Sequence, residues 1–91
     1  MKDLILNVKT EYFNEIKSGE KTKEYRMVNY YWNRRLQGKK FNNVIIRLGY
    51  PKAGDGNREL IFPFRGYEIE SITHKHFGEK PVEVYAIILN N

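Results

Sequence analysis

The sequence predicts an α+β fold, either a small mixed β-barrel or a strongly bent sheet with two short helices. Apolar residues alternate with a period of two near the N-terminus and again in the second half of the chain. Two segments with apolar spacings of three and four lie between them, and a glycine follows each. The expected order is strand, helix, strand, helix and then roughly four strands, which is typical of α+β domains.

Length and composition limit the class of protein. Ninety-one residues predict one domain spanning residues 1–91, and 41% hydrophobic residues are enough to exclude global disorder. The chain has no cysteine, which excludes disulfides, thiolate metal sites and cysteine nucleophiles. No apolar run approaches the ~20 residues of a membrane helix, and the N-terminal apolar run is too short for a signal peptide. We therefore expect a cytoplasmic protein without a membrane partner.

The balance of charges is basic. Sixteen Lys and Arg residues against eleven Asp and Glu residues give a net charge of +5. Such a surface favours anionic partners, nucleic acid first, although a charge of this size also serves solubility alone.

The first half of the chain predicts two strands and two helices. Alternation from Leu4 to Val8 predicts a strand with one buried face. Thr10 to Ser18 predicts a helix with Thr10 as its N-cap, and Gly19 suits the left-handed conformation that ends helices. Thr22 to Met27 predicts a strand. Asn29 is the expected N-cap of a second helix, Tyr30 to Gln37.

Side-chain directions follow from these elements. Glu24 and Arg26 are two apart and share one face of a strand, which we expect to line a groove. Tyr25 then faces the opposite way and is expected to cover core. Trp32 and Leu36 are four apart on the second helix, and we assign Trp32 to the core.

The second half of the chain is rich in strand patterns. Residues 43–50 predict a central strand, and residues 51–57 are dense in turn formers and predict a hairpin loop. A shift of the apolar phase around Pro63 and Gly66 predicts a sharp bend that turns a barrel corner. The apolar run 82–89 predicts a strand buried on both sides.

Four titratable residues of this half leave alternatives open. Glu68 and Glu70 share a face, where one is expected to meet solvent and the other is a candidate second carboxylate for the groove. His74 and His76 are two apart, but no Cys or Asp near them completes a metal-binding set. We therefore expect no metal and no cofactor.

The stretch Gly19 to Arg26 packs five charged side chains into eight residues. One interpretation is a solvated edge strand, since charged edges prevent sheets from pairing with neighbours. The other is a binding site. Lys21 offers a point charge and Arg26 a rigid fork of donors for phosphate, while Glu24 accepts hydrogen bonds from an amine or a ribose hydroxyl.

The motif Gly-x-Lys-x-x-Glu-x-Arg, formed by Gly19, Lys21, Glu24 and Arg26, resembles the signature of ASCH domains, which belong to the PUA-like superfamily. A short helix also precedes the motif in that family, and the downstream aromatic helix and the terminal strands fit as well, so the resemblance covers most of the chain. It implies a PUA-like β-barrel with short helices, whose cleft is lined by Lys21, Glu24 and Arg26.

Aromatic and basic residues interleave directly after the motif, a pattern that suits stacked bases and phosphates of single-stranded nucleic acid. The expected ligand is RNA, a nucleoside or a nucleotide. The candidate binding residues are Lys21, Lys23, Glu24, Arg26, Tyr30, Tyr31, Arg34 and Arg35.

Three classes of function remain open from the sequence, of which an RNA- or nucleotide-binding ASCH-like domain is the first. The second is a small metal-independent hydrolase acting on RNA or on acylated cytidine nucleosides, with Lys21 and Glu24 as catalytic residues. In the amidohydrolase branch of the family a threonine nucleophile occupies the position of Glu24, and Thr22 lies two residues away. The third is a protein-interaction module with a vestigial cleft. For a binding site we expect Lys21→Ala and Arg26→Ala to lose the ligand with little change in stability.

Overall fold

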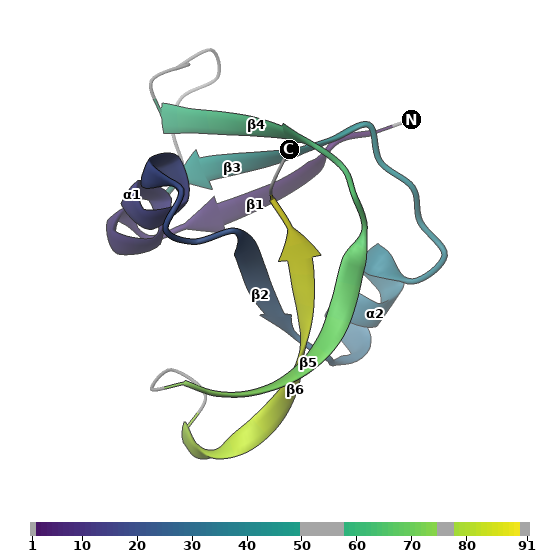
Figure 1. The fold of residues 1–91 in the computed structure, drawn as a ribbon. Coiled ribbons are helices and arrows are strands. Elements are labelled where there is room, and N and C mark those ends of the chain that lie inside the picture. Colours follow the sequence, from purple (N-terminus) through teal and green to yellow (C-terminus); the bar gives the residue numbers. More distant parts are fainter. Residues whose placement is uncertain (1, 50–57, 75–77, 90–91) are drawn as a thin grey trace.

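The computed structural model describes residues 2–49, 58–74 and 78–89, in which two three-stranded sheets and two helices surround one core (Figure 1). The small α+β fold expected from the sequence is confirmed. In chain order the elements are β1 (Leu4–Val8), α1 (Thr10–Ser18), β2 (Lys23–Met27), α2 (Tyr30–Leu36), β3 (Asn43–Leu48), β4 (Glu59–Pro63), β5 (Tyr67–His74) and β6 (Gly78–Ile88).

The first sheet has the order β1-β3-β4, with β1 parallel and β4 antiparallel to the central β3. Leu4 lies opposite Val44 and Leu6 opposite Ile46, and all four side chains are buried. Alternation along β1 thus produced one buried face, as expected.

The second sheet is antiparallel, with the order β2-β6-β5. Its central strand β6 is buried on both sides from Val84 to Ile87, where four consecutive side chains are at most 1% exposed, and is exposed or half-buried before them. Burial on both sides, expected for the run 82–89, is thus confirmed for its central part, whereas Glu83 is exposed. Tyr85 and Ile87 face the main core, whereas Val84 and Ala86 lie outside that cluster, on the other face.

The chain passes from the first sheet to the second between β4 and β5, where the ribbon bends sharply in Figure 1. Gly66 takes a positive φ of 87° at this bend, a conformation that glycine adopts without steric cost. Across residues 2–49, 58–74 and 78–89 the strand ladders form two separate sheets and do not close into a barrel.

Capping residues mark the start of each helix and the end of α1. Gly19 is left-handed with φ 88° and donates its N–H to the Ile16 carbonyl, which ends α1 as expected. The N-cap position of α1 is Lys9 rather than Thr10, which is the first helical residue. Asn29 caps α2, because its side chain accepts a 2.9 Å hydrogen bond from the Trp32 N–H.

Two expectations fall on parts of the chain that lie outside the described residues, namely the 51–57 hairpin and His76 together with the side chain of His74. Neither helix within the described ranges has the length and apolar character that crossing a membrane requires.

Candidate functional site

A cleft of about 630 Å³ lies between β1 and β2, with α2 contributing one wall. Within the described residues β1 pairs with β3 and β2 pairs with β6, so the two strands present edges to each other across the cleft. The lining residues are Ile5, Leu6, Asn7, Val8, Lys9, Tyr12, Lys21, Glu24, Tyr25, Arg26, Met27, Asn29, Tyr31, Trp32 and Arg35.

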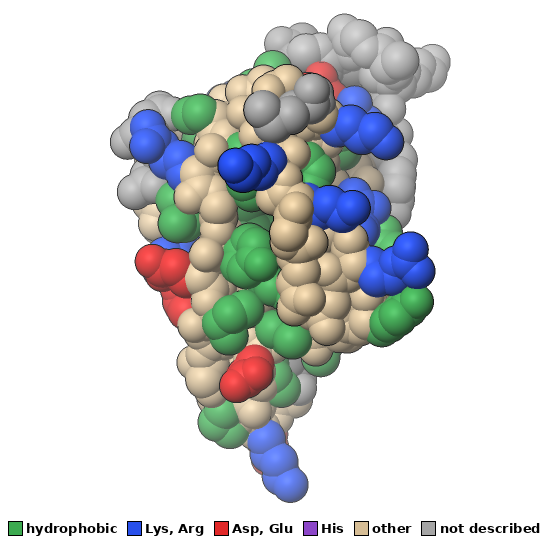
Figure 2. All heavy atoms as spheres, turned by 90° about the vertical axis from the view of Figure 1, so that its right-hand side faces the viewer, with side chains coloured by type: hydrophobic (Ala, Val, Ile, Leu, Met, Phe, Trp, Pro, Cys, Tyr) green, Lys and Arg blue, Asp and Glu red, His purple; other side chains and the backbone are tan. Residues whose placement is uncertain are grey.

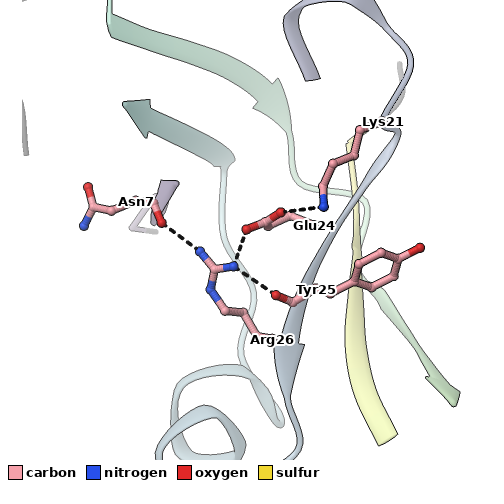
Figure 3. Close-up of polar contacts among 5 residues, drawn as sticks. All are labelled: Asn7, Lys21, Glu24, Tyr25 and Arg26. Atoms are coloured by element: carbon pink, nitrogen blue, oxygen red, sulfur yellow. Dashed lines mark hydrogen bonds and ion pairs between the residues drawn. The ribbon is translucent and has the colours of Figure 1, made fainter. Parts of the chain in front are cut away.

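Glu24 is the buried acidic group of the cleft, with 4% of the residue exposed. Its Oε1 lies 3.1 Å from the Lys21 Nζ, and its Oε2 is bound by the Arg26 Nη1 (Figure 3). A buried carboxylate is costly unless it is paired, and here both oxygens are paired with cations. The three motif residues therefore form one charged cluster, the Glu24 trio (Lys21, Glu24 and Arg26).

Backbone geometry explains how Lys21 reaches Glu24. The left-handed Gly19 turns the chain out of α1, and the Lys21 N–H donates to the Glu15 carbonyl at 3.0 Å. Lys21 is thereby held close to the start of β2. Its ammonium lies 4.9 Å from the ring centroids of both Tyr12 and Tyr25, within the range of cation–π attraction.

Arg26 joins the two strand edges. Its Nη1 donates to the Tyr25 carbonyl at 2.9 Å on β2, and its Nη2 donates to the Asn7 carbonyl at 3.1 Å on β1 (Figure 3). The guanidinium therefore satisfies backbone acceptors of both sheets while it neutralises Glu24. This changes the expectation for Arg26→Ala, because removing these bonds must also cost stability.

Tyr25 does not cover core, and that expectation was wrong. The residue is half-buried, and its ring points away from Glu24 (Figure 3), on the same face of β2 as Lys23, while Glu24 takes the buried position on the strand. The alternation of side chains along β2 was predicted correctly, but Glu24 rather than the aromatic Tyr25 faces the core. Pairing with Lys21 and Arg26 allows the carboxylate to be buried instead.

Tyr12 also lines the cleft, and its position on the apolar stripe of α1 was the single signal in the sequence that could have placed it there. Its hydroxyl oxygen is buried. Burial raises the pKa of this phenol above its ordinary 10.0, and the carboxylates of Glu11, Glu15 and Glu24 raise it further.

Trp32 both packs against the core and lines the cleft, which extends the core role expected for it. The guanidinium carbons of Arg26 and Arg35 lie 5.4 Å and 5.2 Å from its ring centroid. Arg35 also donates to the Tyr31 hydroxyl at 2.8 Å, which fixes both side chains on the cleft side of α2.

Three predicted binding residues lie away from the cleft lining: Lys23, Tyr30 and Arg34. Tyr30 and Arg34 form their own pair, with a 3.0 Å hydrogen bond, on a different part of the α2 surface. A helix turns about 100° per residue, so neighbours of cleft residues point elsewhere. Lys23 is one residue from Glu24 and therefore lies on the opposite face of β2.

On that opposite face Lys23 binds two carboxylates, at 3.2 Å from Glu68 Oε2 and 2.6 Å from Glu70 Oε2. These hydrogen bonds, first Glu70 and then Glu68, raise the pKa of the Lys23 ammonium above 10.5. Neither Glu68 nor Glu70 therefore supplies a second carboxylate to the cleft. Both belong to the Lys23 trio (Lys23, Glu68 and Glu70) on the opposite face of β2.

The charges that line the cleft are Lys9, Lys21, Arg26 and Arg35 against Glu24, a net charge of +3. A second, shallower depression adjoins it near α1 and carries three carboxylates against two lysines: Glu11, Glu15, Glu20, Lys21 and Lys23. Thr22 lines this depression and not the cleft. Basic side chains are also spread over the face drawn in Figure 2, where acidic ones are fewer.

Among the described residues no group of three or more His, Cys, Asp or Glu side chains could hold a metal ion. The chain matches no protein-family model, no curated protein and no solved structure.

Proposed function

We propose that the protein is an RNA- or nucleotide-binding domain of the ASCH-like, PUA-related type, and that the cleft between β1 and β2 is its binding site. The observation that carries the proposal is the Glu24 trio, a buried carboxylate held between two cations in a cleft of net charge +3. An excess of positive charge in a concave, partly apolar site favours an anionic ligand of moderate size.

The donors and acceptors of the trio suit a nucleotide. Lys21 has three N–H donors, of which one points to Glu24, so others can bind a phosphate oxygen. Glu24 accepts one contact at each oxygen, which leaves lone pairs for an exocyclic amine or a ribose hydroxyl. Arg26 has three of its five donors engaged and acts mainly by holding Glu24 in place.

The same contacts favour binding over hydrolysis. Both oxygens of Glu24 are already bound to cations, so the carboxylate is arranged as an acceptor rather than as a free base. Thr22, the nearest threonine to the motif, is exposed and faces the acidic depression. No hydroxyl nucleophile therefore stands in the position that the amidohydrolase branch requires.

Two features support the PUA-like assignment of the fold. The motif residues Lys21, Glu24 and Arg26 line a cleft, which is the position that the ASCH resemblance implies for them. The bend between β4 and β5 also carries the chain from one sheet to the other, as a barrel corner would. We propose that the two sheets are halves of a barrel that is open at the cleft.

The protein provides its own probe for a test, since Trp32 is the single tryptophan and lines the cleft. We expect uridine 5′-monophosphate and a short mixed-sequence RNA to change its fluorescence with saturation. Lys21→Ala should weaken binding by roughly tenfold or more, the loss expected for a charge-assisted contact to phosphate. Lys23→Ala is the matched control on the opposite face and should bind as the wild type does.

Two results would contradict the proposal. In the first, neither ligand changes the Trp32 signal at low salt. In the second, Lys21→Ala and Lys23→Ala weaken binding equally, which would indicate a diffuse effect of net charge rather than a site in the cleft.

A further inference from the structure

Helix α2 carries two tyrosine–arginine pairs of the same chemistry, each with a spacing of four residues. Arg34 donates to the Tyr30 hydroxyl at 3.0 Å and Arg35 to the Tyr31 hydroxyl at 2.8 Å. The guanidinium carbons lie 5.7 Å and 5.4 Å from the respective ring centroids. The pairs differ in position, because Tyr31 and Arg35 line the cleft and Tyr30 and Arg34 do not.

We propose that the Tyr31–Arg35 pair is a second subsite, which takes the adjacent nucleotide of a single-stranded nucleic acid whose first nucleotide is bound by Lys21 and Glu24. The inference rests on the proposed function and makes it more specific. The ligand class becomes a single strand of at least two nucleotides rather than a free nucleoside.

The distribution of charge gives the direction of the strand. Beyond Lys21, toward α1, the acidic depression carries Glu11, Glu15 and Glu20, which repel a phosphate. Toward α2 the charged residues of the cleft are Arg26 and Arg35, whereas the α1 side has a single further cation of the cleft, Lys9 at the N-cap position of α1, beside the three carboxylates. A polyanion bound at Lys21 therefore continues toward α2, where Arg35 meets its next phosphate.

The aromatic residues of this wall decide where a base can stack. Two guanidinium groups, those of Arg26 and Arg35, lie over the Trp32 ring, whereas Arg35 alone lies over the Tyr31 ring. Tyr31 packs edge-on against Trp32, with centroids 5.1 Å apart and planes at 88°, and 56% of Tyr31 remains exposed. An exposed tyrosine beside an arginine is a suitable platform for an unpaired base, which can stack on the phenol ring.

The test compares the affinities of uridine 5′-monophosphate and the dinucleotide pUpU, measured by calorimetry at fixed salt. We expect pUpU to bind the wild type roughly tenfold more tightly, the gain typical of one stacked base. Tyr31→Ala and Arg35→Ala should each reduce this ratio to nearly one. The matched variants Tyr30→Ala and Arg34→Ala should keep the wild-type ratio, because they alter the same chemistry outside the cleft.

The outcomes separate this inference from the proposed function. If the monophosphate binds and pUpU binds no more tightly, the second subsite is rejected and the nucleotide site stands. A gain that survives in Tyr31→Ala, or that Tyr30→Ala removes equally, also rejects the subsite. If neither ligand binds, the proposed function itself fails. Where pUpU does bind more tightly than the monophosphate, the deoxy form of the dinucleotide shows which sugar the subsite takes. A gain in affinity that is confined to pUpU assigns the subsite to RNA.

Discussion

The two faces of β2 carry charged trios of opposite composition. On the cleft side one carboxylate, Glu24, lies between two cations, and on the other side one cation, Lys23, lies between two carboxylates. The Glu24 trio is largely buried, with side-chain exposures of 6% for Glu24 and 18% for Lys21 and Arg26. In the Lys23 trio the three side chains are 28% to 58% exposed.

This difference in solvent contact determines what each trio can do. Ion pairs in contact with water contribute little stability, because water screens the charges and the long side chains lose entropy. Removing one member of a buried pair strongly lowers the free energy of unfolding, because the remaining charge is left without compensation. Glu24 and Lys23, one position apart on the same strand, thus contribute differently to stability. The charges on the cleft side have the larger effect.

The largest effect should follow from neutralising the buried carboxylate. Glu24→Gln leaves Lys21 and Arg26 facing each other without a counter-charge, and we expect a loss of roughly 2–4 kcal/mol, somewhat below the full range for buried pairs because the two cations keep some water. Urea unfolding monitored by Trp32 fluorescence measures it. Glu70→Gln is the matched change in the Lys23 trio and should leave the midpoint unchanged. Equal losses in the two variants would contradict the comparison.

An intermediate effect should follow from Arg26→Lys, which keeps the charge and removes the fork of donors. A lysine cannot reach Glu24 and the carbonyls of Asn7 and Tyr25 together, so we expect a loss of about 1–2 kcal/mol. Hydrogen exchange should also become faster at amides of β1 and β2 that line the cleft.

Arg47→Lys provides the control for that substitution. Arg47 pairs with Glu59 across β3 and β4 and is more exposed than Arg26. We expect this variant to unfold as the wild type does. A loss as large as that of Arg26→Lys would show that the bridge between the two sheets has no special role.

The smallest effect concerns alkaline pH and the Lys23 trio. Because the folded pKa of Lys23 is raised, its contribution is present below pH 10.5 and is lost as the pH rises through the higher folded value. Stability should therefore decline at the alkaline end, and slightly less so in Lys23→Gln.

Tyr12 acts in the same direction, since its pKa is raised above 10.0. Tyr12→Phe should remove a late-ionising phenol from the ultraviolet titration, and loss of a phenol that ionises near pH 10.0 instead would contradict the buried position of the Tyr12 hydroxyl.

Local chemistry made much of the fold predictable. Period-two alternation in β1, the left-handed Gly19 and the Asn29 cap each act within a few residues, so the sequence indicates them directly. The bend around Gly66 was also visible as a shift of the apolar phase. The pairing of the strands was not predictable in detail, because the parallel contact of β1 with β3 joins segments far apart in the chain.

The candidate site divides in the same way. The sharing of one face by Glu24 and Arg26 follows from strand geometry alone, and so does the grouping of Tyr31 with Arg35 on a helix. The contact of Arg26 with Asn7 depends on bringing two strand edges together across a cleft. No local pattern marks Asn7, because its backbone carbonyl rather than its side chain makes the bond.

Local patterns in the chain account for the helices, most of the strands and the charged motif between two aromatic segments. Which of the charges are buried depends on the folded arrangement of the strands. Periodicity assigns residues to a face but does not say which face meets the core, and here the polar Glu24 was buried while Tyr25 stayed half-exposed. A carboxylate is buried only where partners compensate its charge, and in the folded chain Lys21 and Arg26 contact the two oxygens of Glu24.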